Sequence, residues 1–471
     1  MMESSKEIKI LDDLNINYDN LVNSTLDVFN DCILIINSDN IEKLNNYVKE
    51  SLNKKPKYII TSINCQVESA NVIKFKNYED IFNHMLKKMY PEYESKNFFG
   101  LTGTNGKTTT GYYLSQLLGK NSLFIGTTEA NLFKDITKEE HLTTPKLFNI
   151  FKLLRKKEYV DIDNIILEVS SHALDQNRLE NLNFLISGFT NLSQDHFDYH
   201  QNIQNYFEAK KKLFNKNLSL QYVYVDSSWG RKLNDEINNK SKSVGFDKDN
   251  DLSINRIKSF ESETLVDFKI SNVEYSVRLP FIGPNCEMNY LLAVGMAYFS
   301  ESLSMEQIIS NTGNVNNPKG RFEKLTYKQN DIYIDYAHTP EAIERAILLV
   351  KDKYKEVTVI LGAGGNRDHQ KRLLMGKAAN HADEIIITND NPRKEDPMFI
   401  AKEILGGIDL NKKVEIILDR KVAIKKGLDS LRGNSVLLVL GKGHEKTQEL
   451  KDGFVKFDDH EIINKLIEDM K

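Results

Sequence analysis

The chain has 471 residues, of which 40% are hydrophobic and 28% charged, and its formal net charge at pH 7 is −4. This length exceeds what one compact core usually holds, so we expect two to four domains. The small negative charge argues against a nucleic-acid partner. No window approaches the roughly 20 apolar residues that a membrane span needs.

Cysteine usage and the N-terminus indicate the compartment. The three cysteines (Cys32, Cys65 and Cys286) lie far apart and form no CxxC pair. Such spacing is typical of a reduced cytoplasm and offers no structural zinc site. The polar N-terminus shows no secretory signal pattern. We therefore expect a cytoplasmic protein without a membrane partner.

Residues 1–94 have the pattern of a small α/β domain without a chemical motif. Short apolar runs predict buried strands, and apolar residues at helical spacing predict helices. The polar stretch 91–96 is expected to be a linker. The predicted elements are strands at 32–36 and 58–61 and helices at Ile41–Leu52 and Tyr78–Met89.

From residue 97 onward, strand and helix patterns alternate, which predicts a mainly parallel sheet with helices on both faces. Residues 264–270 and 275–279 alternate apolar and polar side chains, which indicates antiparallel strands. The other predicted elements are strands at 98–101, 122–126, 165–169 and 184–189 and helices after the 100–110 loop and at 147–156, 203–213 and 287–299.

The turn cluster at 316–320 marks a second boundary. Beyond it, a new alternation over 332–440 predicts a second doubly wound domain of about 150 residues, similar to a Rossmann fold. The sequence thus predicts three α/β domains, at 1–94, 95–317 and 318–471. The central one would be a doubly wound sheet of the P-loop ATPase kind with a small antiparallel part.

Residues 100–110 (GLTGTNGKTTT) form a glycine-rich loop between a predicted strand and a predicted helix. Loop and helix N–H groups in this context cradle phosphates. Lys107 would reach the outer phosphates, and the Thr108 hydroxyl would bind Mg²⁺. The strict Walker pattern is missed, because its first glycine position is Leu101. A glycine turn followed by a chance Lys-Thr is the alternative.

Two further motifs follow buried strands. Glu168 lies at the carboxyl end of one, where a carboxylate beside a phosphate loop would contact Mg²⁺. By itself, such a glutamate is more often a helix cap or a surface charge. His196 and His200 are four residues apart, but no HExxH motif or third ligand supports zinc. An imidazole near Mg²⁺ and phosphate is the better interpretation.

The helix at 206–214 ends with Lys210, Lys211 and Lys212. By composition alone, this is a solvated basic face.

Taken together, these motifs resemble the Mur ligases, and within that family the UDP-N-acetylmuramoyl-tripeptide synthetases of the MurE type. The resemblance covers about residues 97 to 460. It rests on TGTNGKTTT (102–110), TTP (143–145), EVSSHALDQNR (168–178), FTNLSQDHFDYH (189–200), YFEAKKKLF (206–214), GRFE (320–323), DYAHTP (335–340), GGNRD (364–368), DNPR (390–393) and GKGHE (441–445).

The resemblance implies roles that the residues alone do not. Lys210 matches a lysine that the family carbamylates, and a carbamate turns an ammonium into an anionic oxygen ligand. The implied catalytic residues are Lys107, Glu168, His196 and Lys210, and the implied metal ligands are Thr108, Glu168, His196 and carbamylated Lys210. The implied ATP contacts are Gly103, Thr104, Asn105, Gly106, Lys107, Thr108, Thr109, Asn289, Arg321, Asp335 and His338.

The resemblance also implies two substrate sites. Arginine in the DNPR motif goes with meso-diaminopimelate in this family, since it can bind the second carboxylate bidentately, whereas lysine-adding relatives have other residues there. The implied contacts to the amino acid are Arg367, Asp390, Asn391, Pro392, Arg393, Gly441 and Glu445. Those to the UDP-muramoyl-peptide are Ser24, Thr143, Thr144, Ser170, Gln176 and Arg178.

The implied protein is a monomeric, ATP- and Mg²⁺-dependent ligase of peptidoglycan precursor synthesis. It would add meso-diaminopimelate to UDP-N-acetylmuramoyl-L-alanyl-D-glutamate through an acyl phosphate. Two departures stand out: the N-terminal domain is short for uridine binding, and Asn285-Cys286 replaces the usual Phe-Asn. The alternatives are L-lysine as substrate, an amide ligase of the folylpolyglutamate or cyanophycin synthetase kind, and a P-loop switch without ligase chemistry.

Overall fold

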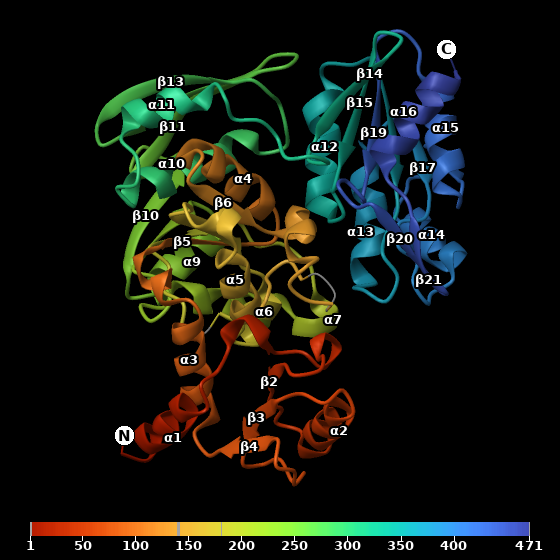
Figure 1. Cartoon of the computed structure of the whole chain (residues 1–471). Coiled ribbons are helices and arrows are strands. Elements are labelled where there is room, and N and C mark those ends of the chain that lie inside the picture. The colour runs from red at the N-terminus through yellow and green to blue at the C-terminus, as the bar shows by residue number, and fades with distance from the viewer. Residues whose placement is uncertain (1, 139–141, 180, 471) are drawn as a thin grey trace.

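The structure, a computed structural model, describes residues 2–138, 142–179 and 181–470. Three main β-sheets with packed helices follow one another along the chain. In Figure 1 the N-terminal part lies at the bottom, the central part above it, and the blue C-terminal part at the upper right. The predicted α/β class with three parts is confirmed, whereas the residue bounds of the three domains remain a prediction.

The N-terminal sheet has four parallel strands in the order β1-β2-β3-β4. Helices α2 and α3 have the predicted bounds. Asn40 begins α2 by accepting a hydrogen bond from the Lys43 amide, a cap that favours helix initiation there. The elements are β1 (Leu21–Val22), β2 (Ile33–Ile35), β3 (Tyr58–Ser62), β4 (Val72–Phe75), α1 (Met2–Asp13), α2 (Ile41–Leu52) and α3 (Tyr78–Met89); α1, β1 and β4 were not predicted.

The expected linker at 91–96 is a short 3-10 helix, Pro91–Ser95. Tyr93 on this helix packs its ring 5.0 Å from that of Phe151. Ile81 of α3 and Phe98 of the first central strand belong to the same hydrophobic cluster as Phe151. The N-terminal and central parts therefore share apolar core across the predicted boundary.

The central sheet has nine strands in the order β13-β12-β11-β10-β9-β8-β5-β7-β6. Pairing is parallel from β6 to β11 and antiparallel between β11, β12 and β13. The predicted antiparallel part therefore continues the parallel sheet. The strands are β5 (Asn97–Thr102), β6 (Ser122–Ile125), β7 (Asn164–Glu168), β8 (Ile186–Phe189), β9 (Gln221–Val225), β10 (Lys240–Gly245), β11 (Leu252–Ser259), β12 (Thr264–Ile270) and β13 (Val273–Leu279).

Helices cover both faces of this sheet, as predicted. Phe98 and Phe99 are neighbours on β5 but belong to two different clusters, because successive strand residues point to opposite faces. Phe98 packs on the side of α5 and α8, and Phe99 on the side of α4 and α10. The helices are α4 (Lys107–Leu118), α5 (Leu147–Leu154), α6 (Ser171–Asp175), α7 (Phe197–His200), α8 (Ile203–Lys211), α9 (Ser228–Glu236), α10 (Cys286–Phe299) and α11 (Met305–Thr312).

The C-terminal sheet has the order β14-β15-β19-β16-β17-β18 and is parallel except for its edge strand β14. A separate hairpin, β20–β21, was not predicted. The elements are β14 (Glu323–Tyr327), β15 (Asn330–Asp335), β16 (Glu356–Leu361), β17 (Glu384–Ile387), β18 (Lys413–Ile416), β19 (Ser435–Leu440), β20 (Thr447–Leu450), β21 (Gly453–Lys456), α12 (Pro340–Lys351), α13 (Gln370–Ala379), α14 (Pro397–Leu405), α15 (Arg420–Ser430) and α16 (Asp459–Asp469).

None of the helices in the described part of the chain combines the length and the apolar character needed to cross a bilayer.

A fully buried ion pair joins α15 to α16. Arg420 donates from Nε and Nη2 to the Asp459 carboxylate at 2.8 and 2.7 Å, and neither side chain is exposed. Breaking a buried pair leaves an uncompensated charge, so Asp459→Asn should lower the free energy of unfolding by roughly 3–5 kcal/mol in urea titrations. The control Glu415→Gln, which removes a half-exposed pair with Lys426, should cost less than about 1 kcal/mol. Equal losses in the two variants would contradict this prediction.

Candidate functional site

The glycine-rich loop joins β5 to α4, as the sequence predicts. Gly103 and Gly106 have φ values of +146° and +87°, which L side chains rarely adopt, and a Cβ on Gly106 would lie 2.4 Å from Asn289 Oδ1. The Asn105 amide donates to Asn191 Oδ1 at 3.0 Å. Lys107 Nζ folds back on the loop and donates to the carbonyls of Gly103 and Thr104, at 3.0 and 2.9 Å.

Two buried lysines meet at this loop. Lys210 Nζ, from the end of α8, donates to the Gly103 carbonyl at 2.7 Å, the same oxygen that Lys107 contacts. Burial and the charge of Lys107 hold the pKa of Lys210 well below its usual range. Burial also lowers the pKa of Lys107. The solvated basic face that composition suggested therefore does not include Lys210.

The other predicted metal ligands lie around the same loop, where each contacts other residues of the protein. Glu168 is buried at the end of β7 and accepts hydrogen bonds from the Thr127 amide and hydroxyl, both at 3.1 Å. The Thr108 hydroxyl accepts a bond from Arg321 instead. Within the described residues, no group of three or more His, Cys, Asp and Glu side chains is arranged to hold a metal ion.

His196 has left-handed backbone geometry, with φ of 55°, and lies at the start of α7. Burial lowers the pKa of its ring below the usual range, which favours the neutral form with a lone pair on one nitrogen. His200 Nε2 contacts Ser171 Oγ at 2.9 Å. The rings of both histidines pack against His172, at centroid distances of 5.0 Å for His196 and 5.5 Å for His200.

A pocket of about 80 Å³ lies between the central and C-terminal parts. Arg321 joins them by donating from Nη2 to the Thr108 hydroxyl at 2.8 Å. Asp335 is held by the amides of Phe322 and Ala337, and burial raises its pKa. The predicted ATP contacts among the lining residues are Asn105, Gly106, Thr109, Asn289, Arg321 and Asp335. Asn285 and Cys286, where the chain departs from the family pattern, also line the pocket.

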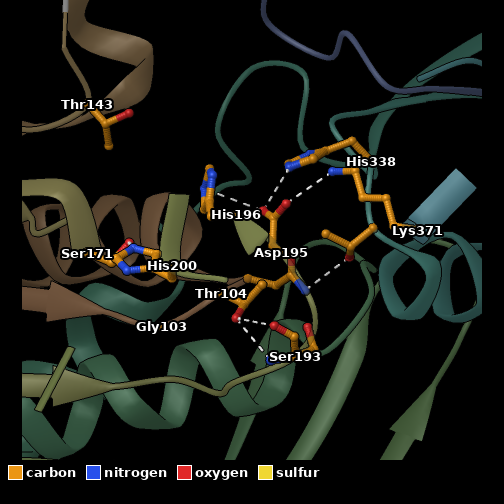
Figure 2. A network of polar contacts seen from close by, with 12 residues as sticks. Gly103, Thr104, Thr143, Ser171, Ser193, Asp195, His196, His200, His338 and Lys371 are labelled. Carbon is orange, nitrogen blue, oxygen red and sulfur yellow. Dashed lines mark hydrogen bonds and ion pairs between the residues drawn. The ribbon is translucent and has the colours of Figure 1, made fainter. Parts of the chain in front are cut away.

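A carboxylate that was not predicted from the sequence, Asp195, connects the two parts. Asp195 Oδ1 lies 3.1 Å from Lys371 Nζ, and its Oδ2 lies 3.5 and 3.7 Å from the Nε2 atoms of His196 and His338 (Figure 2). Burial by itself would raise the pKa of Asp195, but the Lys371 charge and the two rings hold it well below its usual range.

Asp195 is next to His196 in the same sequence motif, and this position could have identified it as a candidate site residue. Lys371 lies on α13, after the GGNRD motif, and no feature of the sequence around it indicates a role in the site. Gln194 adds a bond of 3.2 Å to Asp368, so two successive residues contact the C-terminal part.

The predicted contacts to the UDP-muramoyl-peptide form one hydrogen-bonded network, apart from Ser24. The Thr144 hydroxyl donates to the Glu168 carbonyl at 2.7 Å and accepts from the Ser170 amide at 2.9 Å. Arg178 donates to the Thr144 carbonyl and to Gln176 Oε1. Thr127 Oγ1, which contacts Glu168, lies 3.3 Å from Thr143 Oγ1.

Ser24 lies in the N-terminal part, where its hydroxyl accepts from the Leu26 amide. It lines a separate pocket of about 430 Å³ with polar and aromatic side chains from several elements and loops. The other polar and aromatic lining residues are Asn23, Thr25, Asn37, Ser38, Asp39, Tyr47, Tyr78, Glu79, Phe82 and Lys146.

The predicted amino-acid contacts gather beyond the carboxyl ends of β16, β17 and β19. Asn391 donates to Glu445 Oε2 at 2.9 Å, and a Cβ on Gly441 would lie 2.5 Å from Asp390 Oδ2. Arg393 Nη1 donates to the Gly365 carbonyl at 2.9 Å, beside the exposed Arg367. Two residues of this cluster escaped the sequence analysis: Lys442, whose Nζ lies 2.7 Å from Glu445, and Glu449, 2.6 Å from Arg393 Nε.

Comparison with known families matches residues 101–297 to the Mur ligase middle domain and residues 320–443 to the glutamate ligase domain of Mur ligases.

Several relatives that match most of the chain share one name. Proteins called UDP-N-acetylmuramoyl-L-alanyl-D-glutamate--2,6-diaminopimelate ligase are 36% identical in Rickettsia montanensis, covering 90% of either chain, and 37% identical in Aquifex aeolicus, covering 79% of this chain and 78% of the relative. A third, named as ligase 1, from Clostridium acetobutylicum, is 31% identical and covers 98% of this chain and 97% of its own.

Solved structures share the fold. A UDP-N-acetylmuramoyl-L-alanyl-D-glutamate--2,6-diaminopimelate ligase superimposes with a TM-score of 0.64 at 24% identity, covering 96% of this chain and 94% of that one. The MurF ligase of Thermotoga maritima in complex with ADP gives 0.66 at 16% identity, covering 96% and 98%.

The contact of Asp195 with Lys371 predicts how the two parts stay together. Lys371→Met leaves a buried carboxylate without its closest cation, so we expect the C-terminal part to move away from the central one. Small-angle X-ray scattering should then give a larger radius of gyration than for the wild type. The control Lys377→Met changes an exposed lysine of the same helix and should leave the radius unchanged. An unchanged radius in Lys371→Met would contradict the prediction.

Proposed function

The chain belongs to the Mur ligase family, and on that premise we propose that it joins meso-diaminopimelate to UDP-N-acetylmuramoyl-L-alanyl-D-glutamate while ATP is cleaved to ADP and phosphate. The names of relatives that match most of the chain support this assignment. The observation that carries it is Arg393, a partly exposed guanidinium paired with Glu449 in a cluster beyond the strand ends of the C-terminal sheet. An amino acid with a second carboxylate fits such a group.

The reaction proceeds in two steps. The substrate carboxylate attacks the γ-phosphorus of ATP, and the bond to the β-phosphate oxygen breaks to give an acyl phosphate and ADP. The amine of the second substrate then attacks the acyl carbon, and the tetrahedral intermediate expels phosphate and loses a proton. Both steps depend on positioning and on charge compensation more than on covalent chemistry by the protein.

The residues of the loop supply that charge. Its backbone amides and Lys107 would bind the phosphates, which requires Lys107 to exchange its two carbonyl contacts for phosphate oxygens. Arg321 brings a second positive charge to Thr108 from the C-terminal part. Closure of that part would exclude water, which otherwise hydrolyses the acyl phosphate.

The residues around the loop fit Mg²⁺ under one condition. Thr108, Glu168 and His196 offer a hydroxyl, a carboxylate and a neutral imidazole, but the Lys210 ammonium would repel a cation. As a carbamate, Lys210 would instead provide an anionic oxygen, the ligand type that Mg²⁺ prefers. Bound Mg²⁺ would offset the negative charge of the phosphates. The depressed pKa of Lys210 supports this proposal, because only a neutral amine adds carbon dioxide.

The two departures from the family pattern find places in this proposal. The pocket lined by Ser24 would hold the uridine part, with aromatic faces from Tyr47 and Tyr78 and amides from Asn23 and Asn37. Thr143, Thr144, Ser170, Gln176 and Arg178 would hold the muramoyl-peptide. Asn285 and Cys286 would line the adenine end of the ATP pocket, where Arg345 contacts Asn285.

L-lysine is the second candidate substrate. Glu449 already compensates the charge of Arg393, which weakens the preference for a carboxylate. Family membership argues against a P-loop switch without ligase chemistry and the relatives' names against a folylpolyglutamate or cyanophycin synthetase. We also propose a cytoplasmic monomer without nucleic-acid or membrane partners, supported by the net charge of −4 and by three buried, unpaired cysteines.

Phosphate release tests the reaction. The purified protein should release phosphate from ATP only when the UDP-muramoyl-dipeptide and an amino acid are both present, with meso-diaminopimelate the preferred amino acid. Arg393→Ala should raise the KM for meso-diaminopimelate by about ten- to a hundredfold at nearly constant kcat, because it removes a charge-assisted contact that forms on binding.

The matched control for that variant is Arg432→Ala, which changes an arginine at the opposite end of β19 that contacts backbone carbonyls. ATP turnover that needs neither substrate would sink the proposed reaction, and L-lysine outperforming meso-diaminopimelate would overturn the assignment of the amino acid.

Carbamylation has its own readout. With ¹³C-bicarbonate, NMR should detect a carbamate carbon in the wild type and in Lys211→Arg, whose lysine is paired with Glu208 and Glu236 at the surface, but not in Lys210→Arg. The kcat of Lys210→Arg should fall by about a hundredfold or more, because a charge-compensating anion is lost. A carbamate signal that survives in Lys210→Arg would refute the assignment to this residue.

A further inference from the structure

The β20–β21 hairpin brings a carboxylate to the DNPR loop, and its backbone fixes where that carboxylate lies. Gln448 Nε2 donates to the Asp390 carbonyl at 2.7 Å. The Glu449 amide donates to Asn391 Oδ1 at 2.9 Å, and the Arg393 amide donates to the Glu449 carbonyl at 3.1 Å. These three bonds hold strand β20 against the loop, so Glu449 and Arg393 are neighbours through the fold of the backbone.

The two side chains form a close pair that remains open to a ligand. Arg393 Nε lies 2.6 Å from Glu449 Oε2, and 20% and 32% of the respective side chains are exposed. Nη1 of Arg393 is used by the Gly365 carbonyl. Nη2 has no partner among the residues that the structure describes, so that edge of the guanidinium can still donate to a ligand carboxylate.

The negative charge of the other carboxylate in the cluster, Glu445, is already compensated by a buried lysine. Glu445 Oε2 lies 2.7 Å from Lys442 Nζ and accepts a bond from Asn391 at 2.9 Å. The Lys442 side chain is fully buried, with further bonds to Asn391 Oδ1 and the Thr447 carbonyl. The family resemblance assigns Glu445 to the substrate, but Lys442 already compensates most of the negative charge of Glu445. Glu449 is the more exposed of the two carboxylates.

We propose that Arg393 and Glu449 act as one clamp for the end of the amino acid that does not react. The guanidinium binds the carboxylate of that end, and Glu449 binds its ammonium. This inference rests on the proposed function and names a further specificity-determining residue for it. The non-reacting end of meso-diaminopimelate carries one charge of each sign, as the clamp does, so binding compensates both charges and leaves neither group of the clamp unpaired.

Three amino-acid substrates test the two groups of the clamp separately. Meso-diaminopimelate has a carboxylate and an ammonium at the distal end, 2-aminopimelate has the carboxylate alone, and L-lysine has the ammonium alone. Glu449 should attract the ammonium of the first and third and repel the carboxylate of the second.

The test is Glu449→Gln, which keeps the side-chain shape and both backbone bonds to the DNPR loop. Its thermal unfolding should match that of the wild type. The KM for meso-diaminopimelate and for L-lysine should rise about tenfold, the size of one lost charge-assisted hydrogen bond. The KM for 2-aminopimelate should stay constant or fall, because a repulsive charge is removed. Glu461→Gln, which changes an exposed glutamate paired with Lys456 of the same hairpin, is the matched control and should change none of the three.

The outcomes distinguish this inference from the proposed function. An equal change of all three KM values in Glu449→Gln, or no change for meso-diaminopimelate, would overturn the clamp while leaving the ligase assignment intact. A wild-type protein that uses none of the three amino acids would overturn the proposed function and the clamp together.

Discussion

The site depends on the convergence of two lysines on one carbonyl. Lys107 and Lys210 both donate to the Gly103 oxygen, and burial lowers the pKa of both. A lowered pKa favours the neutral form of an amine, so burial of the two lysines relieves the repulsion that two ammonium groups on one oxygen would have. Phosphate groups would satisfy Lys107, and conversion of Lys210 to a carbamate would remove the repulsion from the other side. The proposed chemistry follows from this constraint.

The C-terminal part completes the site from outside the central sheet. Arg321 contacts Thr108, and His338 and Lys371 contact Asp195. Three side chains of the C-terminal part therefore reach two residues of the central part. Because the partners of Asp195 come from both parts, its low pKa depends on their staying together. A ligand that binds between them would therefore act on the same charges that hold them.

Local signals explain what the sequence predicted well. Helices α2 and α3 begin and end at the predicted residues, because their apolar side chains recur at helical spacing within one continuous stretch of sequence. The loop at 100–110 was predictable because its motif residues are also consecutive in the sequence. Asp195 and Lys371 lie 176 positions apart, and no periodicity connects them. Strand β21 escaped because all four of its residues are exposed, which removes the alternation on which strand prediction depends.

The missed hairpin matters for the choice of substrate. From the sequence alone, Arg393 is a positive charge that would bind a carboxylate of the substrate. With Glu449 at 2.6 Å and Lys442 beside Glu445, the cluster becomes two neighbouring ion pairs with little net charge. Such an arrangement disfavours a ligand with a net distal charge, since each added charge leaves one group of the cluster without its counterpart. Discrimination between amino acids then depends on the geometry of paired charges rather than on the presence of an arginine.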